Sequence, residues 1–173
     1  MHRISVNVTE CWSKGYEKVQ KDGLLLNSIS KDGKPNSMTI GWWIFGWNYM
    51  GKPMSAVAVR PARYTFTLLD EVEEYVVSIP NPGIEEAVSY CGRASGRDVD
   101  KFSEANLTIV ESAHVKPPSI KECFANVECR IYYKQRPPHE ILSPQFRELP
   151  IKEQHTIYFA EVLGIYRYIK RET

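Results

Sequence analysis

The stretch GLLLNSISKDGKPNSMTIGWW, residues 23–43, decides the fold that we expect for this chain. Residues 23–29 are mostly apolar, which is typical of a buried strand, and residues 30–36 (SKDGKPN) supply the Asp-Gly pair and the proline of a tight turn. A second strand follows from residue 37, so the stretch predicts a β-hairpin. Because side chains alternate along a strand, Trp42 and Trp43 are expected on opposite faces, where only one of them can line a given pocket.

Apolar and β-branched residues predict four more strands, and helical spacing predicts short helices between them. The strands are expected at residues 54–60, 75–79, 122–135 and 155–169, and the helices at residues 62–74, 83–92 and 98–107. Regular βαβ alternation is missing, which argues against a parallel sheet. We therefore expect a mainly β fold with short helices, arranged as a closed or split antiparallel β-barrel.

Composition limits the classes of function that this chain can serve. Its 173 residues are 43% apolar and 25% charged, so we expect residues 1–173 to form one globular domain. Lys and Arg number 22 against 21 Asp and Glu, a balance that argues against a nucleic-acid partner. The sequence has neither the apolar region of a secretory signal nor a run of ~20 apolar residues, so we expect a cytoplasmic protein without a membrane partner.

The cysteines and histidines show no pattern of a cross-linked or metal-binding protein. Cys11, Cys91, Cys123 and Cys129 form no C-x-x-C pair, and the four histidines lack metal-ligand spacing. We therefore expect reduced thiols and no metal ion. The role of Cys91 stays open, since this thiol could serve packing or redox chemistry.

The segment VRPARYT, residues 59–65, has the residues of an anion-binding corner. Arg60 and Arg63 follow a strand, and Tyr64 and Thr65 open the next helix. Free N–H groups at a helix start, a hydroxyl and guanidinium groups together favour a phosphate. The alternative is a solvated pair of arginines beside an ordinary helix cap.

The segment CGRASGRDVDKF, residues 91–102, is a second candidate for phosphate binding. Its glycines permit close backbone approach, while Ser95 and Lys101 add a hydroxyl and a cation. It matches neither a P-loop nor a dinucleotide-binding fingerprint. The alternative is a simple turn followed by a helix cap at Asp98.

The segment NSMTIGWWIFGW, residues 36–47, could serve a planar cofactor. The tryptophan rings can stack on such a cofactor, and the main chain can reach the polar rim of the cofactor if Gly41 allows a close approach. The alternative is a hydrophobic core or a dimer interface, between which Trp42, Trp43 and Trp47 could be divided.

Four stretches in this order resemble the flavin reductase-like FMN-binding split-barrel family, and more closely its flavoredoxin-like branch. They are DGKPNSMTIGWW, VRPARYT, CGRASGRDVDKF and the terminal HTIYFAEVLGIY, which together span most of the chain. The resemblance implies a split barrel of the FMN-binding type that forms a homodimer with one FMN per subunit near the subunit interface.

The same resemblance implies roles for ten residues. Those expected near the flavin ring, chiefly through main chain, are Asn36, Met38, Thr39 and Trp42. Those expected around the ribityl chain and the phosphate are Arg60, Arg63, Tyr64, Thr65, Ser95 and Lys101. The flavin carries the redox chemistry, so no side chain is expected to be catalytic.

The segment KEQHTIYF departs from the family pattern. NADH-using flavin reductases that serve monooxygenases have a Gly-Asp-His motif before the last strand, and here only His155 matches it. The leading hypothesis is an FMN-dependent oxidoreductase that passes hydride or electrons from a reduced donor, such as NAD(P)H, to free flavin or a protein acceptor. The alternatives are a flavin carrier or electron-transfer module reduced by a partner protein, and a barrel that binds another apolar ligand. His155 is a candidate for contact with a nicotinamide or the flavin edge, or a structural histidine.

Overall fold

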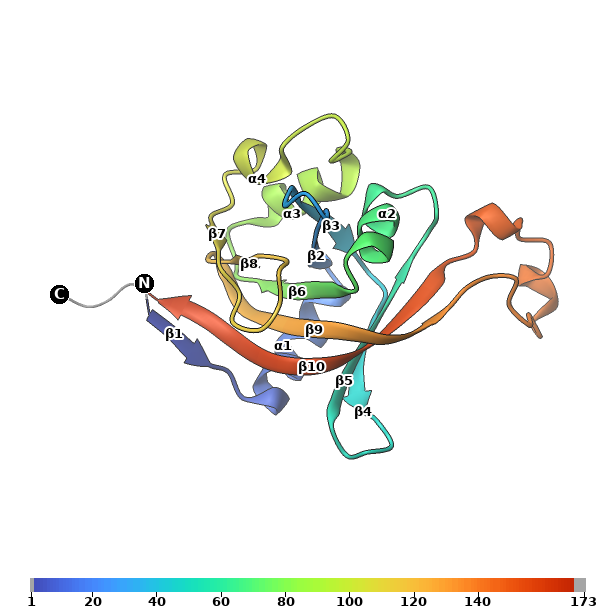
Figure 1. Cartoon of the computed structure of the whole chain (residues 1–173), viewed down its shortest axis with the longest axis horizontal. Coiled ribbons are helices and arrows are strands. Elements are labelled where there is room, and N and C mark those ends of the chain that lie inside the picture. Colours follow the sequence, from blue (N-terminus) through green and yellow to red (C-terminus); the bar gives the residue numbers. More distant parts are fainter. Residues whose placement is uncertain (1, 170–173) are drawn as a thin grey trace.

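The computed structural model describes residues 2–169 and is a strongly curved antiparallel sheet with short helices around it (Figure 1). The elements, in chain order, are β1 (His2–Ser5), α1 (Val8–Val19), β2 (Leu24–Ile29), β3 (Pro35–Ile40), β4 (Trp43–Trp47), β5 (Pro53–Val59), α2 (Tyr64–Glu71), β6 (Glu74–Pro80), α3 (Glu85–Arg93), α4 (Lys101–Glu104), β7 (Ile109–Val110), β8 (Ser119–Ile120), β9 (Cys123–Gln135), η1 (Pro144–Phe146), η2 (Ile151–Glu153) and β10 (Thr156–Ile169).

The large sheet is open between two strands that are neighbours in the sequence. Its strand order is β3-β2-β6-β9-β10-β5-β4, with β1 paired to β10 as well, and its pairings are antiparallel. β3 and β4 therefore lie at opposite ends of the order, although only Gly41 and Trp42 separate them along the chain. The sheet must curl until its two ends nearly meet, which confirms the predicted split antiparallel barrel.

The predicted hairpin is present, with a different second strand. β2 and β3 pair from Leu24 opposite Ile40 to Ile29 opposite Pro35, and Gly33 takes the positive φ that the turn requires. β3 already ends at Ile40, so the single strand expected through residue 43 was wrong. The chain bends at Gly41 and Trp42 before β4 begins, because β4 has to pair with β5 at the other end of the sheet.

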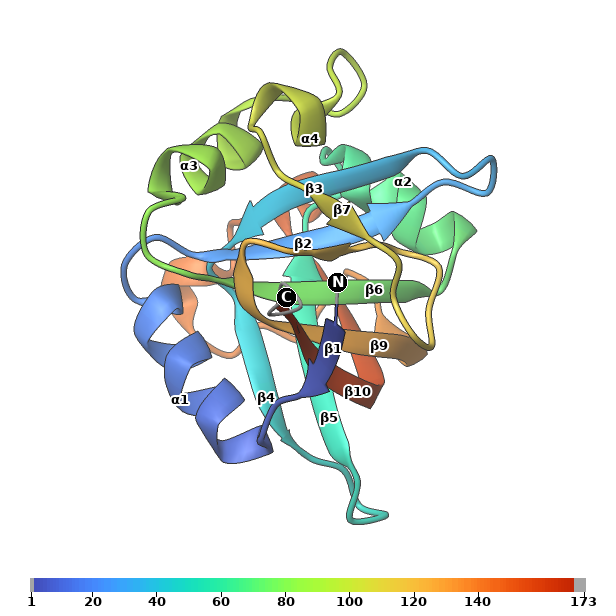
Figure 2. The ribbon, with the colours of Figure 1, turned by 90° about the vertical axis from the view of Figure 1, so that its left-hand side faces the viewer.

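The barrel interior is filled by alternate side chains of its strands. The main core includes the fully buried Tyr75 and Tyr158, and a second cluster packs α3 and α4 against β2. The second cluster consists of Leu25, Val88, Cys91, Phe102, Leu107, Ile120 and Cys123. Figure 2 shows α3 and α4 next to the β2–β3 hairpin, with α1 on another side of the barrel. The sequence predictions omitted α1 and β1.

A buried chain of side-chain hydrogen bonds crosses four neighbouring strands. Ser37 on β3 donates to Asn27 on β2 at 2.8 Å, and Asn27 donates to Ser78 on β6 at 2.8 Å. Ser78 donates in turn to Asn126 on β9 at 2.6 Å. A slip of any of these strands by one residue would move a polar side chain to the other face and leave its partner unsatisfied. The network therefore fixes the register of the strands that support the hairpin.

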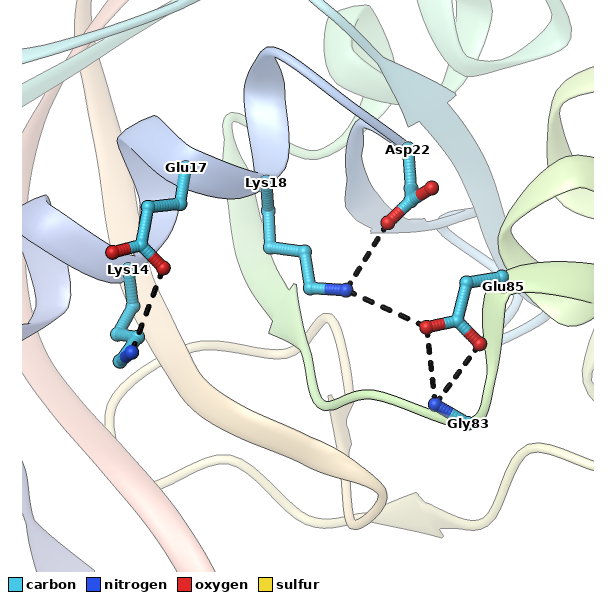
Figure 3. Close-up of polar contacts among 6 residues, drawn as sticks. All are labelled: Lys14, Glu17, Lys18, Asp22, Gly83 and Glu85. Carbon is cyan, nitrogen blue, oxygen red and sulfur yellow. Dashed lines mark hydrogen bonds and ion pairs between the residues drawn. The ribbon is translucent and has the colours of Figure 1, made fainter.

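The end of α1 is tied to the start of α3 by ionic contacts (Figure 3). Lys18 lies 3.1 Å from Asp22 and 3.7 Å from Glu85, and Glu85 also accepts hydrogen bonds from the backbone N–H of Gly83. The N–H bonds and Lys18 hold the pKa of Glu85 below its usual value. These contacts join α1 to the side of the barrel on which α3 lies.

Gly15 is expected to be required for the packing of α1 against Trp43, and stability measurements can test this. A Cβ at this position would lie 2.3 Å from a ring carbon of Trp43, so Gly15→Ala should lower the free energy of unfolding by about 1–3 kcal/mol through overpacking. Helix propensity alone predicts the opposite sign, a gain of up to about 1 kcal/mol. Ser13→Ala on the exposed face of α1 is the matched control, and urea denaturation of both variants decides between the two effects.

Candidate functional site

Two loops that are distant in the sequence converge on one cavity beside the hairpin. The cavity has a volume of about 280 Å³, and its lining comes from β3, the start of α2, the end of α3 and the following loop. The lining residues are Asn36, Met38, Ala62, Arg63, Tyr64, Thr65, Cys91, Gly92, Arg93, Ala94, Ser95, Gly96, Arg97 and Lys101. Four of them are cationic and none is acidic. We call this space the anion cavity.

The start of α2 presents hydrogen-bond donors to the anion cavity. Arg63 is the N-cap residue and makes no side-chain capping bond, so the N–H groups of the first turn are not used by a cap. Thr65 is buried, and its hydroxyl oxygen accepts a hydrogen bond of 3.0 Å from the side-chain amide of Asn36. Because this bond occupies an oxygen lone pair, the hydroxyl proton of Thr65 can point elsewhere. The geometry suits an anion at the N-terminus of α2.

Lys101 places a buried cation at the cavity. Its side chain is only 5% exposed, and its Nζ donates a hydrogen bond of 2.8 Å to the backbone carbonyl of Cys91. Burial, together with the nearby charge of Arg63, lowers the pKa of Lys101. A buried ammonium group without a carboxylate is costly, and a bound anion would offset that cost.

Gly96 brings the 94–97 loop close to Asn36. A Cβ at position 96 would lie 2.0 Å from Oδ1 of Asn36 and 3.0 Å from the ring of Tyr64, so this backbone approach requires glycine. Oδ1 of Asn36 is buried and has no hydrogen-bond partner among the described residues. An orphaned polar atom at the edge of a donor-rich cavity indicates a place where a polar ligand or water completes the hydrogen bonding.

A second, smaller cavity adjoins the first at the opening of the barrel. Its volume is about 170 Å³, and it is lined by Met38, Thr39, Ile40, Gly41, Trp42, Ala58, Arg60, Arg63 and His155. The rings of Trp42 and His155 lie 5.3 Å apart, centroid to centroid, at an angle of 54°. Met38 and Arg63 line both cavities, so the two cavities lie side by side. We call this part the ring cavity.

The side of the ring cavity at β10 is held by polar contacts. Arg60 forms an ion pair of 3.1 Å with Glu153 on η2, and Nε2 of His139 lies 2.7 Å from the backbone carbonyl of His155. Partial desolvation and the charges of Arg60 and Arg63 lower the pKa of His155. The imidazole is therefore biased toward its neutral form, in which one ring nitrogen donates and the other accepts.

The structure brings together all ten side chains that the sequence analysis singled out. Thr39, Trp42 and Arg60 line the ring cavity, and Met38 and Arg63 line both cavities. Asn36 lies in the anion cavity beside Thr65. The remaining four, Tyr64, Thr65, Ser95 and Lys101, line the anion cavity.

Two arginines in the anion cavity had no role in the sequence analysis. Arg97 lies 5.2 Å over the ring of Tyr64, and Arg93 donates to the hydroxyl of Ser89. Both belong to the glycine-rich segment 91–102, which was the available signal. Cys91 also lines this cavity, but it is buried and desolvation raises its pKa, which favours packing over thiolate chemistry.

Residues 2–169 contain neither a metal-binding cluster nor a membrane-spanning helix. No group of three or more His, Cys, Asp and Glu side chains in this part of the chain could hold a metal ion. No helix within the same residues has the length and apolarity needed to cross a bilayer. All four cysteines are free and buried.

The effect of neighbouring charges on the pKa of His155 can be tested by titration. Arg60→Ala should raise the pKa of His155, because it removes a positive charge that disfavours imidazolium and leaves the Glu153 carboxylate unpaired nearby. Glu153→Gln should lower the same pKa. NMR titration of the His155 ring checks both signs. A pKa that moves in the same direction in the two variants would contradict this electrostatic account.

The chain is similar to curated proteins in sequence and to solved structures in fold. The chain is 42% identical over 106 residues to an uncharacterized protein of Archaeoglobus fulgidus, with 60% of this chain and 57% of that protein covered. It is 38% identical over 79 residues to the uncharacterized protein PYRAB12460 of Pyrococcus abyssi, with 46% of this chain and 45% of that protein covered. The chain thus spans about half the length of these curated relatives.

Solved structures share the fold. A flavoredoxin from Methanosarcina acetivorans is 27% identical with a TM-score of 0.68, covering 87% of this chain and 70% of that one. Flavoredoxin of Desulfovibrio vulgaris (Miyazaki F) is 24% identical with a TM-score of 0.67, covering 86% and 69%. The model of the flavin reductase like domain matches residues 23–171, which include both loops of the anion cavity and the strands around the barrel opening. The chain therefore belongs to the flavin reductase like domain family.

Proposed function

We propose that this protein binds FMN across the two cavities and works as a flavin-dependent oxidoreductase. The observation that carries the proposal is the adjacency of two cavities of different character. A cavity lined by four cations lies beside a cavity lined by Trp42 and His155, and Met38 and Arg63 line both. A flavin mononucleotide has the same division, with a dianionic phosphate at one end and a flat ring at the other. Solved structures with this fold include an FMN-binding domain from Shewanella baltica OS155 and an FMN-binding protein from Thermus thermophilus, which supports the choice of flavin.

The anion cavity fits the phosphate of FMN. Lys101, Arg63 and the first turn of α2 would hold it, with the hydroxyls of Thr65 and Ser95 as further donors. A phosphate carries a charge of about −1.5 to −2 at pH 7, which matches a donor set without any carboxylate. Asn36 would then orient Thr65 through its hydrogen bond.

The ring cavity fits the flat part of the flavin. Main chain at Thr39 to Gly41 can reach the polar rim of the ring, and Trp42 supplies an aromatic surface. FMN, when bound, supplies the redox chemistry by taking up a hydride or electrons and passing them on. The protein would hold the flavin in place, and the neutral bias of His155 would leave a hydrogen-bonding group at the edge of the site. No side chain needs to act as an acid or base for this.

The chain also exposes the apolar surface that a homodimer would cover. Segment 142–151 projects from the barrel (Figure 1) with Leu142, Phe146, Leu149 and Ile151 exposed. An apolar groove lined by Val8, Thr9, Trp12, Phe45, Gly46 and Trp47 is open on the same chain. Exposed apolar surface of this kind favours association with another protein chain. We therefore propose a homodimer, and expect the FMN-loaded protein to sediment as a dimer. A purely monomeric boundary at micromolar concentration would exclude it.

The proposed function is tested by flavin uptake and reduction. We expect the apoprotein to quench the fluorescence of added FMN with a one-to-one stoichiometry, and the loaded protein to lose its flavin absorbance band when mixed with a reduced pyridine nucleotide. A chain that takes up no FMN would overturn the proposal. Uptake without bleaching by either NADH or NADPH would favour the second candidate, an electron-transfer module reduced by a protein.

Variants of the anion cavity test, in the same FMN titration, whether this cavity binds the phosphate. Lys101→Ala and Thr65→Ala should each weaken FMN binding by about 1–3 kcal/mol, because the phosphate loses a charged or hydroxyl partner. Riboflavin, which lacks the phosphate, should bind these variants as it binds the unmodified protein. Lys31→Ala, in the exposed hairpin turn, is the control for the loss of one positive charge. Unchanged FMN affinity in both cavity variants would remove the phosphate assignment.

A further inference from the structure

The anion cavity holds more positive charge than one phosphate can balance. Five cations gather at it: Arg63, Arg93, Arg97 and Lys101 line the cavity, and Lys34 donates a hydrogen bond of 3.2 Å to the backbone carbonyl of Gly96 in its wall. Within residues 2–169, none of the five has a carboxylate within ion-pair distance. The whole chain has a net charge of only +1, so the concentration is local.

Neighbouring acidic residues do not neutralise this cluster. Asp100 uses its carboxylate to accept from the N–H groups of Phe102 and Ser103 at the start of α4. Asp98 does not line the cavity and forms no ion pair among the described residues. One phosphate of charge about −2 would therefore leave roughly three positive charges in excess. These like charges disfavour one another, and a second bound anion would relieve that repulsion.

The cations fall into a buried and an exposed group. Lys101 is buried beneath the cavity, whereas Arg93, Arg97 and Lys34 are exposed at its rim. Arg97 is held over the face of Tyr64 and reaches the carbonyl of Ala62, and Arg93 is held by Ser89, so both guanidinium groups are anchored by neutral partners. An anchored guanidinium loses less freedom when it binds a phosphate. The rim is therefore suited to an anion that arrives from solvent.

We propose that Arg93 and Arg97 bind the 2′-phosphate of NADPH and so select NADPH over NADH as the electron donor. This inference rests on the proposed function, with a reduced pyridine nucleotide as the electron donor. The two nucleotides differ only in the 2′-phosphate, a dianion that suits arginine side chains. Because the two cavities adjoin, a nucleotide whose nicotinamide faces the ring cavity can direct its other end toward the rim of the anion cavity.

Binding of nucleotide fragments tests the proposed role of Arg93 and Arg97 without any redox reaction. FMN-loaded protein is titrated calorimetrically with adenosine 2′,5′-bisphosphate and with adenosine 5′-monophosphate. We expect the bisphosphate to bind about tenfold or more tightly than the monophosphate, since it adds charge-assisted hydrogen bonds. Arg93→Ala and Arg97→Ala should each reduce this ratio, and the double variant should abolish it. Lys21→Ala, in the exposed turn after α1, removes the same charge elsewhere and should preserve it.

Kinetics give a second, independent readout. With FMN at saturation, each arginine variant should raise KM for NADPH by a larger factor than KM for NADH. FMN affinity, measured separately on each variant, shows that the flavin site is intact. Equal affinities for the two fragments, or a preference that survives the double variant, would overturn the inference while FMN binding still supports the proposed function. Failure to take up FMN would instead overturn the proposed function.

Discussion

The site depends on one constraint, the failure of the sheet to close between β3 and β4. These strands are separated by two residues in the chain but stand at opposite ends of the strand order. Gly41 and Trp42 have to cross the remaining gap, and no ladder of backbone hydrogen bonds fills it. Main chain is thus exposed at the opening with donors and acceptors that a closed barrel would have used internally. The ring cavity lies there, and a flat, polar-edged ligand is what such a gap can hold.

The rest of the architecture holds this opening in place. The buried network from Ser37 to Asn126 fixes the register of β3 relative to β2, β6 and β9. On the other side, Trp43 donates through its ring N–H to Ser55 at 3.0 Å and packs against Gly15 of α1. Trp42 and Trp43 thus divide their roles, one facing the cavity and one facing the core. Both edges of the opening are therefore held by buried contacts, and the space between them is preorganised.

Much of the fold could be predicted because its signals are local. Alternating apolar residues and turn residues located β2, β5, β6, β9 and β10, and the lack of βαβ alternation excluded a parallel sheet. The break at Gly41 was missed because a glycine inside an apolar run is compatible with a continuous strand. What breaks the strand is the need of Trp43 to pair with Val57 on β5, a contact between distant positions in the sheet. The helix α1 was missed as well.

The sequence by itself determined which chemical groups this protein has at its candidate site: arginines after a strand, a glycine-rich segment with Lys101, and tryptophans beside glycine. Only the tertiary structure decided that these groups line two adjoining cavities. It also placed Asn36 beside Thr65 and added Arg93 and Arg97 to the anion cavity. The physical reason is distance along the chain. Local pattern reports what a segment can form, whereas the curl of the sheet and the packing of α3 on β3 decide what lies across from it.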